Sequence, residues 1–169
     1  LKLLSEKDFI IFGNLPYNIS SQILINFINY SHLKFSYKKL ILMFQKEVAD
    51  RILAEDNSKN YGRLSIFSSW KLEAKKLIDI NPSSFFPKPK VMSSLLIFKP
   101  KINYIKLKDS KNLEYITNVF FSQRRKMIKK PLNILFKNSK DVINKLDLDV
   151  NLRPQNLKKD TFYKICLIY

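Results

Sequence analysis

An uninterrupted run of five apolar residues at positions 40–44 constrains the fold of this chain more than any other stretch. A run of this length is typical of a strand, and the absence of polar alternation is typical of a strand covered on both faces. A second apolar run, residues 9–12, lies between Asp8 and Gly13. The run at 40–44 therefore predicts a strand covered on both faces, and the run at 9–12 predicts a short buried strand.

Helical and strand patterns alternate around these two runs. The predicted elements are, in order, a strand at 8–12, a helix capped by Ser20 or Ser21, a strand at 40–44, a helix at 47–54, and strands near 77–80 and at 94–98. Residues 62–70 fit either pattern, and residues 81–90, with three prolines, predict a structured loop. This order predicts the second half of a doubly wound α/β domain.

The pattern changes after Pro100. A polar stretch leads into three helical patterns, carried by Ile116 and Phe120 with Met127, by Val142, Ile143 and Leu146, and by residues 162–168. We therefore predict an α/β part over residues 1–100, a linker over 101–110 and a small all-helical part over 111–169.

Charge is the strongest global signal. The 169 residues carry 31 Lys and Arg against 14 Asp and Glu, a formal net charge of +17, which indicates a polyanionic partner. No apolar run approaches the roughly 20 residues that span a bilayer, and the basic residues are spread along the chain rather than gathered on one amphipathic helix. Nucleic acid is therefore the favoured partner, and no membrane association is expected.

The chain has one cysteine and one histidine. Cys166 excludes an internal disulfide framework, fits a reducing cytoplasm and is expected to be a small core residue. His32 lacks the partners that a metal site or a catalytic triad needs, so we expect it on the surface or in a loop. No metal is predicted.

Asn14, Leu15, Pro16 and Tyr17 follow the first predicted strand at its carboxyl end, where open α/β sheets bind ligands. An Asn oxygen and the carbonyl after it can accept both N–H bonds of an adenine amine, which is otherwise a poor nucleophile. Pro16 offers no competing N–H, and the Tyr17 ring offers a face for a flipped base. The same residues also fit an ordinary strand-to-helix turn with an Asn cap and a packed Tyr.

This motif, which continues as Asn18-Ile19-Ser20, resembles the catalytic motif of the rRNA adenine N6-methyltransferases. Four further segments, in order and spacing, resemble the branch that dimethylates two adjacent adenosines near the 3′ end of small-subunit rRNA. They are Gln-Lys-Glu-Val at 45–48, Tyr-Gly-Arg-Leu-Ser at 61–65, Phe-Phe-Pro-Lys-Pro-Lys-Val-Met-Ser at 85–93 and Phe-Ser-Gln-Arg-Arg-Lys at 121–126. The resemblance runs from about residue 8 to the C-terminal end.

The resemblance implies S-adenosyl-L-methionine as cofactor and an immature 30S-type subunit as partner of a protein that is monomeric at full length. Asn14 would touch both the methyl donor and the target amine, helped by the Leu15 and Pro16 carbonyls. Tyr17 and Phe85 would clamp the adenine, while Phe86 is expected in the core. The resemblance also implies that residues 62–70, which fit either pattern, form a helix.

A basic cluster between residues 123 and 130 is predicted to lie on one helix, with an apolar stripe at Phe121, Ile128 and Leu132 and an early end at Pro131. Contacts of this kind position RNA without reading its sequence. The predicted RNA-binding residues are Arg124, Arg125, Lys126, Lys129 and, more weakly, Arg63; Arg51 is another weak candidate.

The family holds its cofactor with a glycine-rich loop, and this chain has only Gly13 and Gly62, neither in a Gly-x-Gly context. We therefore expect a C-terminal portion of a longer methyltransferase, inactive without its other half. Loss of the preceding strands would leave residues 9–12 as an exposed apolar sheet edge.

Two other functions stay open. The chain is also compatible with a non-catalytic RNA-binding or ribosome-assembly factor that keeps the basic surface. Within the enzyme class, a large-subunit rRNA adenine N6-methylase or a relative of mitochondrial transcription factors is the alternative, although segments 45–48 and 123–126 favour the small-subunit branch.

Overall fold

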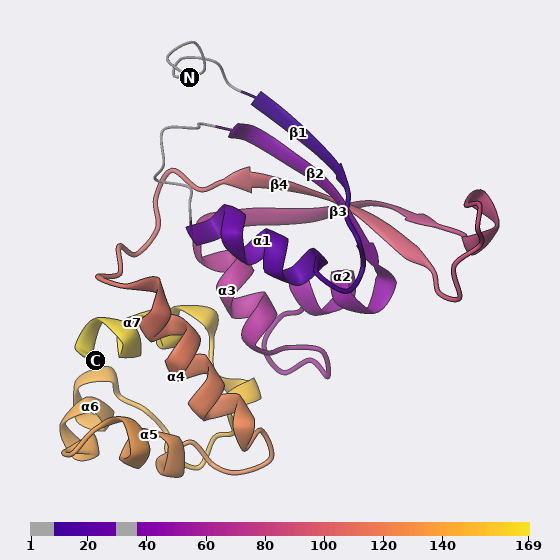
Figure 1. Ribbon diagram of the computed structural model, residues 1–169. Helices are drawn as coiled ribbons and strands as arrows, with labels where there is room; N and C mark the ends of the chain where they lie inside the picture. Colours follow the sequence, from indigo (N-terminus) through magenta and orange to yellow (C-terminus); the bar gives the residue numbers. More distant parts are fainter. Residues whose placement is uncertain (1–8, 30–36) are drawn as a thin grey trace. The chain divides into compact units, whose positions relative to one another are not determined.

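The computed structural model describes residues 9–29 and 37–169, so the prediction for His32 lies outside the described residues (Figure 1). The chain divides into two compact units. The first consists of residues 1–53 and 71–103, and the second consists of residues 54–70 and 104–169. Each unit is therefore described by itself.

The first unit holds a four-stranded sheet in the order β1-β2-β4-β3. Its strands are β1 (Phe9–Asn14), β2 (Tyr37–Gln45), β3 (Leu72–Ile80) and β4 (Ser93–Pro100). β1 and β2 are parallel, whereas β4 is antiparallel to both β2 and β3. The four predicted strands are thus confirmed within a mixed α/β sheet, and Figure 1 shows the β3–β4 connection reaching beyond the ends of β1 and β2.

β1 is an edge strand of the described sheet, because it pairs only with β2. Two of its apolar side chains are open to solvent, with Ile10 47% and Phe12 72% exposed. The expectation of an exposed apolar edge is confirmed, whereas the prediction of a buried strand at 9–12 is wrong, because no residue of β1 is buried. Such an edge, with its unpaired backbone groups, is a template for pairing with another strand.

Helices α1 (Ser20–Asn29) and α2 (Lys46–Ile52) complete the first unit. α1 buries Leu24 and Ile28 at helical spacing, as predicted, and α2 contacts β2, β3 and β4. The predicted strand at 40–44 supplies the centre of the core, where Leu40, Leu42 and Phe44 are fully buried. Phe44 packs edge to face on Phe98 of β4, with ring centroids 6.0 Å apart.

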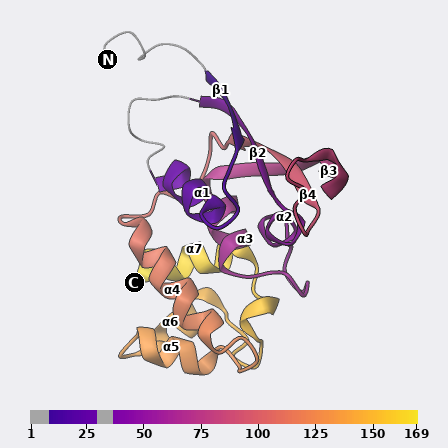
Figure 2. The ribbon, with the colours of Figure 1, turned by 45° about the vertical axis from the view of Figure 1, so that its right-hand side comes forward.

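The second unit is built from helices. They are α3 (Arg63–Lys71), α4 (Ser110–Ser122), α5 (Lys129–Leu135), α6 (Ser139–Leu146), the short 3-10 helix η3 (Pro154–Asn156) and α7 (Lys159–Ile168). α4 contacts α5 and α7, and Figures 1 and 2 both show α4 to α7 gathered together. Phe120 and Phe162, both fully buried, pack edge to face at 5.3 Å. Cys166 is buried as expected, and burial raises the pKa of its thiol to about 11.

Residues 54–70 pack with the C-terminal helices, although the predicted boundaries group them with residues 1–100. Tyr61 is fully buried, and its hydroxyl donates a hydrogen bond of 2.8 Å to the carbonyl of Leu157. Its ring also packs on Phe121 at 6.1 Å. Contacts between residues this far apart in sequence leave no local pattern, which is why the boundaries differ.

The predicted helix over residues 123–130 is wrong. α4 ends at Ser122 and α5 begins at Lys129, and between them Lys126 N–H donates to the Gln123 carbonyl in a turn. Pro131 lies buried in the first turn of α5 rather than ending a helix, because a missing N–H costs nothing there. Met127, expected on a helical apolar face, is 55% exposed.

The described residues contain no helix long and apolar enough to cross a membrane.

We expect the protein to lose stability at alkaline pH. Burial raises the pKa of the Tyr37 phenol from 10.0 to about 12 and also raises those of Tyr61 and Tyr163. Above pH 10 the unfolded chain releases phenol protons that the folded chain retains, so the free energy of unfolding falls as the pH rises from about 10 to about 12. Denaturant unfolding at a series of pH values measures this loss. Complete formation of tyrosinate near pH 10 in a chain that stays folded would contradict it.

Candidate functional site

The residues Asn14 to Tyr17 lie where β1 ends and α1 is about to begin, as predicted. Asn14 is the last residue of β1, pairs with Met43 of the parallel strand β2 and is exposed. The turn is held by Ile19 N–H, which donates to the Pro16 carbonyl at 3.2 Å, and by the Ser20 hydroxyl, which donates to the Tyr17 carbonyl at 3.1 Å. The Asn14 amide therefore stands at the carboxyl end of a parallel pair, where such sheets bind ligands.

The Pro16 carbonyl has two candidate hydrogen-bond donors, one predicted and one observed. The sequence prediction assigns it to the target amine, and in the structure one of its lone pairs accepts from Ile19 N–H. A carbonyl oxygen has a second lone pair, so the hydrogen bond that starts α1 still leaves one acceptor position at Pro16.

Tyr17 is tied to the segment that ends the proline-rich loop. Its hydroxyl lies 2.6 Å from the hydroxyl of Ser93, which is fully buried at the start of β4 and pairs with Gln45 of β2. The neighbouring Met92 carbonyl accepts from Lys46 N–H at 2.9 Å. The first motif and the 85–93 segment therefore meet at one end of the sheet, although Tyr17 and Ser93 are 76 residues apart.

Sequence analysis missed Ser93 as a partner of Tyr17, and its place in the 85–93 segment was the only signal. The next residue, Ser94, donates to Asp79 of β3 at 2.5 Å. Asp79 also forms an ion pair with Lys76 at 2.8 Å. The Lys76 hydrogen bond, and after it the Ser94 one, lowers the pKa of the Asp79 carboxyl. The Ser94–Asp79 hydrogen bond thus joins the start of β4 to the end of β3.

Phe85 and Phe86 have different surroundings. Phe85 is half-buried just after the 3-10 helix η2 (Pro82–Ser84), and its N–H donates to the Pro82 carbonyl. Phe86 is wholly exposed (102%), so its expected place in the core is wrong. The reason is local, because Phe85 has an extended backbone and successive side chains of an extended chain project to opposite sides.

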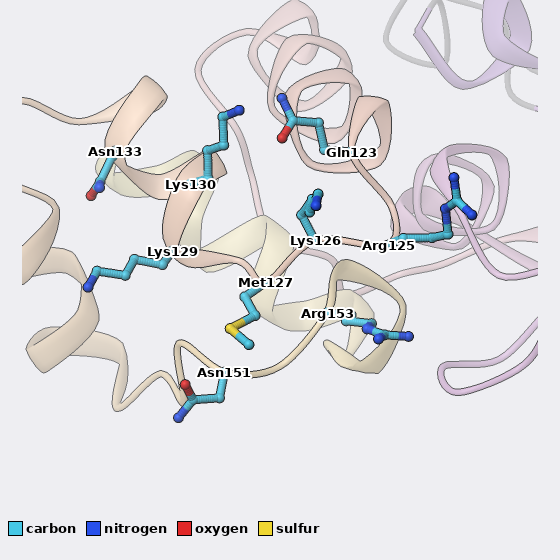
Figure 3. Close-up of a pocket in the computed structure, with 9 residues that line it drawn as sticks. All are labelled: Gln123, Arg125, Lys126, Met127, Lys129, Lys130, Asn133, Asn151 and Arg153. Carbon is cyan, nitrogen blue, oxygen red and sulfur yellow. The ribbon is translucent and has the colours of Figure 1, made fainter.

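A basic pocket lies in the second unit. It has a volume of about 560 Å³ and is lined by Gln123, Arg125, Lys126, Met127, Lys129, Lys130, Asn133, Asn151 and Arg153. Every charged residue in this lining is basic. Figure 3 shows Met127 in the middle, with Lys126 and Lys130 on one side and Asn151 and Arg153 on the other. A cavity of this composition suits an anion with several oxygens, such as a phosphodiester.

The structure does not place all the predicted RNA-binding residues together. Arg125, Lys126 and Lys129 line the basic pocket. Arg63 lies on α3, donates to Asn118 at 3.2 Å and is not among the lining residues. Asn151 and Arg153 were missed because they come from a segment more than 20 residues further along the chain.

Arg124 has an internal role. Its guanidinium donates to the Lys59 carbonyl at 2.6 Å, to the Ser58 carbonyl at 3.3 Å and to Gln155 at 3.2 Å. It thus joins residues 58–59 to η3 within the second unit. Of the two adjacent arginines, Arg125 lines the basic pocket of about 560 Å³, and both line a smaller pocket of about 360 Å³ that shares Lys126 and Lys130 with it.

The described residues do not complete a cofactor site. Among the described residues, Asn14 is the only one that the resemblance assigns to S-adenosylmethionine. A Cβ added to Gly13 would lie 2.8 Å from the Leu42 side chain, so packing within the sheet explains this glycine without a cofactor. Among the described residues there is also no group of three or more His, Cys, Asp or Glu placed to hold a metal ion.

Comparisons with known proteins agree with one another. A family model described as ribosomal RNA adenine dimethylase matches residues 2–169. The ribosomal RNA small subunit methyltransferase A of Pelagibacter ubique is 58% identical over 166 residues, which are 98% of this chain and 63% of that protein. The protein of the same name from Ehrlichia ruminantium is 39% identical over 171 residues, which are 98% of this chain and 62% of that protein. The chain thus spans less than two thirds of the length of these relatives.

Solved structures give the same fold. A dimethyladenosine transferase from Plasmodium falciparum superposes with a TM-score of 0.78 at 30% identity, over 96% of this chain and 67% of that one. The 23S rRNA methyltransferase ErmE superposes with a TM-score of 0.62 at 16% identity, over 94% of this chain and 64% of that one, a likeness of fold alone.

Proposed function

Since the chain belongs to the ribosomal RNA adenine dimethylase family, we propose that it is part of an enzyme that dimethylates N6 of two adjacent adenosines near the 3′ end of small-subunit rRNA. The methyl donor is S-adenosyl-L-methionine, and the reaction takes place in the cytoplasm during ribosome biogenesis. The observation that supports this proposal is the 2.6 Å contact between Tyr17 and Ser93, because it joins the two segments to which the resemblance assigns the target adenine.

In this proposal Asn14 and its turn prepare the amine. The Asn14 amide oxygen accepts one N–H of the adenine amine, and the Leu15 or Pro16 carbonyl accepts the other. Acceptors fixed at these positions favour the state in which the nitrogen becomes positive, and they direct its lone pair outward. S-adenosylmethionine supplies the methyl group, and the amine releases one proton to solvent for each methyl it gains.

Tyr17 and Phe85 hold the flipped base. The Tyr17 ring is kept in place by its hydroxyl contact with Ser93, and the backbone at Phe85 is set by the prolines of its loop. Stacking on each ring contributes roughly 1–3 kcal/mol, which offsets the cost of taking the base out of its stack.

The two units divide the work. The first is the C-terminal half of a Rossmann-like methyltransferase domain whose cofactor loop comes from residues upstream, which pair with the β1 edge. The second is a helical rRNA-binding domain, in which Arg125, Lys126 and Lys129 contact phosphates of the immature 30S-type subunit. The full-length protein acts as a monomer.

Equilibrium binding of labelled S-adenosylmethionine tests the proposal. The chain as given is expected not to bind at micromolar concentration, and the same chain with the residues encoded upstream is expected to bind. If the extended protein neither binds the cofactor nor methylates immature small subunits, the proposed function is wrong.

A non-catalytic RNA-binding factor is the second candidate. It is favoured because the described residues include only one of the expected cofactor contacts, Asn14. Methyl transfer by the extended protein separates the two, because a binding factor retains affinity for small subunits without any transfer.

The adjacent arginines provide a matched pair of variants. Arg125→Ala is expected to weaken binding to immature small subunits and to reduce the slope of log K against log salt by about 1, with stability unchanged. Arg124→Ala is expected to lower the free energy of unfolding by about 1–3 kcal/mol, since its hydrogen bonds to Lys59 and Gln155 are lost. Binding titrations at several salt concentrations and denaturant unfolding measure the two effects. Equal losses of stability in both variants would contradict this division.

A further inference from the structure

Phe86 is an aromatic side chain without cover. Its ring is wholly exposed (102%), and two other apolar side chains of the same connection, Val91 and Met92, are also exposed. Water contact over a whole phenyl ring is unfavourable, so a ring presented in this way gains free energy when a flat apolar partner covers it. In the free protein this unfavourable contact with water is confined to the Phe86 side chain.

The segment that carries Phe86 is held at both ends. At its start, Asn81 accepts from Ser83 N–H and so caps η2. At its end, the Met92 carbonyl accepts from Lys46 N–H, and Ser93 contacts the Tyr17 hydroxyl. Prolines 82, 87 and 89 restrict the backbone between these anchors. The Phe86 ring is therefore presented with little loss of entropy on binding, on the segment that meets the Asn14 turn.

The charged residues close to Phe86 in sequence are all basic. Lys88 and Lys90 are exposed close to Phe86 in sequence, and no acidic residue occurs between Asp79 and Asp109. A partner that fits both features has flat apolar faces and negative charges at short spacing. Single-stranded nucleic acid has this combination, with bases that stack on aromatic side chains and phosphates that pair with lysines.

We propose that Phe86 is a stacking platform for a second unpaired base of the RNA, a neighbour of the adenine held by Tyr17 and Phe85, and that Lys88 and Lys90 contact its phosphates. This inference rests on the proposed function. Phe85 and Phe86 project in different directions from an extended backbone, so one segment holds two nucleotides at once. Phe86 touches no reacting atom, and its role is to bind and position the RNA.

Phe86→Ala in the protein with its upstream residues tests the proposal. Loss of one base stack is expected to weaken binding to immature small subunits about 5- to 150-fold and to raise KM with kcat unchanged. Phe86→Trp is expected to retain the affinity, because it keeps an aromatic face. Ile102→Ala is the matched control, since Ile102 is an apolar side chain of the same unit that is 95% exposed. Its loss is expected to leave affinity unchanged.

Two further measurements identify the partner. Lys88→Gln and Lys90→Gln are each expected to reduce the salt slope of binding by about 1. In an RNA hairpin that contains the two adenosines, the fluorescent adenine analogue 2-aminopurine is placed at each flanking position in turn. Its quenching at one position by the wild type, but not by Phe86→Ala, is the direct signature of the stack.

Several results would overturn the inference. Equal RNA affinity of Phe86→Ala and wild type means that the ring holds no base, whatever the methyl transfer activity. A lowered Tm of Phe86→Ala in the extended protein means that upstream residues of the protein itself cover the ring. Binding to anionic lipid vesicles that depends on Phe86, without an effect on RNA, assigns the ring to a membrane surface. A wild type that binds no RNA refutes the proposed function as well.

Discussion

Replacing Asn14 by Ala in the protein with its upstream residues is expected to lower kcat for methyl transfer by about 10²- to 10³-fold, the usual cost of removing one fixed polar group that stabilises a developing charge. Asn14 ends β1 and presents its amide at the carboxyl end of the β1–β2 pair. The alanine side chain cannot accept a hydrogen bond from the adenine amine. The lone pair of the amine is then no longer directed toward the methyl donor.

Single-turnover methyl transfer to immature small subunits measures this loss. Asn144→Ala is the matched control, since Asn144 is an exposed asparagine of the helix α6 and its removal is expected to leave transfer unchanged. RNA affinity is expected to stay close to that of the wild type, because Asn14 touches only the reacting end of the substrate. A kcat within a few fold of the wild type would remove Asn14 from the chemistry.

Tyr61→Ala is expected to lower the free energy of unfolding by about 3–5 kcal/mol, the range found when a large buried ring is removed. Tyr61 is fully buried, packs on Phe121 and donates its hydroxyl proton to the Leu157 carbonyl. The substitution therefore leaves both a cavity and an unsatisfied carbonyl in the second unit.

Tyr61→Phe separates these two effects. It keeps the ring and removes only the hydrogen bond of 2.8 Å to Leu157, so the expected loss is about 1–3 kcal/mol. Denaturant unfolding of both variants, followed by far-ultraviolet circular dichroism, measures the losses. A Tyr61→Ala variant as stable as Tyr61→Phe would show that the ring is not part of the core.

The strands were predictable because each leaves a local signature. The apolar run at 40–44 indicated β2 directly, since it is buried at the centre of the sheet. α3 was ambiguous for the opposite reason. Its residues Leu64 to Ser68 are all buried, so the helix has no polar face and no amphipathic period from which to recognise it.

The helix predicted over residues 123–130 was wrong because a different structure has apolar residues at the same sequence spacing. Phe121, Ile128 and Leu132 have the separations of one helical stripe, but two helices and a turn hold them. The turn depends on the hydrogen bond from Ile128 N–H to the Leu152 carbonyl, which no local pattern reveals.

In the candidate site, too, local features were predictable from the sequence and long-range contacts were not. The place of Asn14 to Tyr17 at a strand end followed from local order. The Ser93 partner of Tyr17 and the inward bonds of Arg124 depend on residues 76 and 65 positions away. Sequence reasoning therefore placed the predicted residues along the chain but did not give the contacts that orient them.

The hydrogen bond between Tyr61 and Leu157 also implies a delay between the synthesis of residues 54–70 and the completion of their packing. The two residues are 96 positions apart, and a ribosome adds roughly 5–20 residues per second. Residues 54–70 therefore leave the ribosome several seconds, up to about 20, before the helices that cover them exist. During that interval the Tyr61 hydroxyl lacks its Leu157 partner, so the core of the second unit cannot be completed before translation has supplied the C-terminal residues.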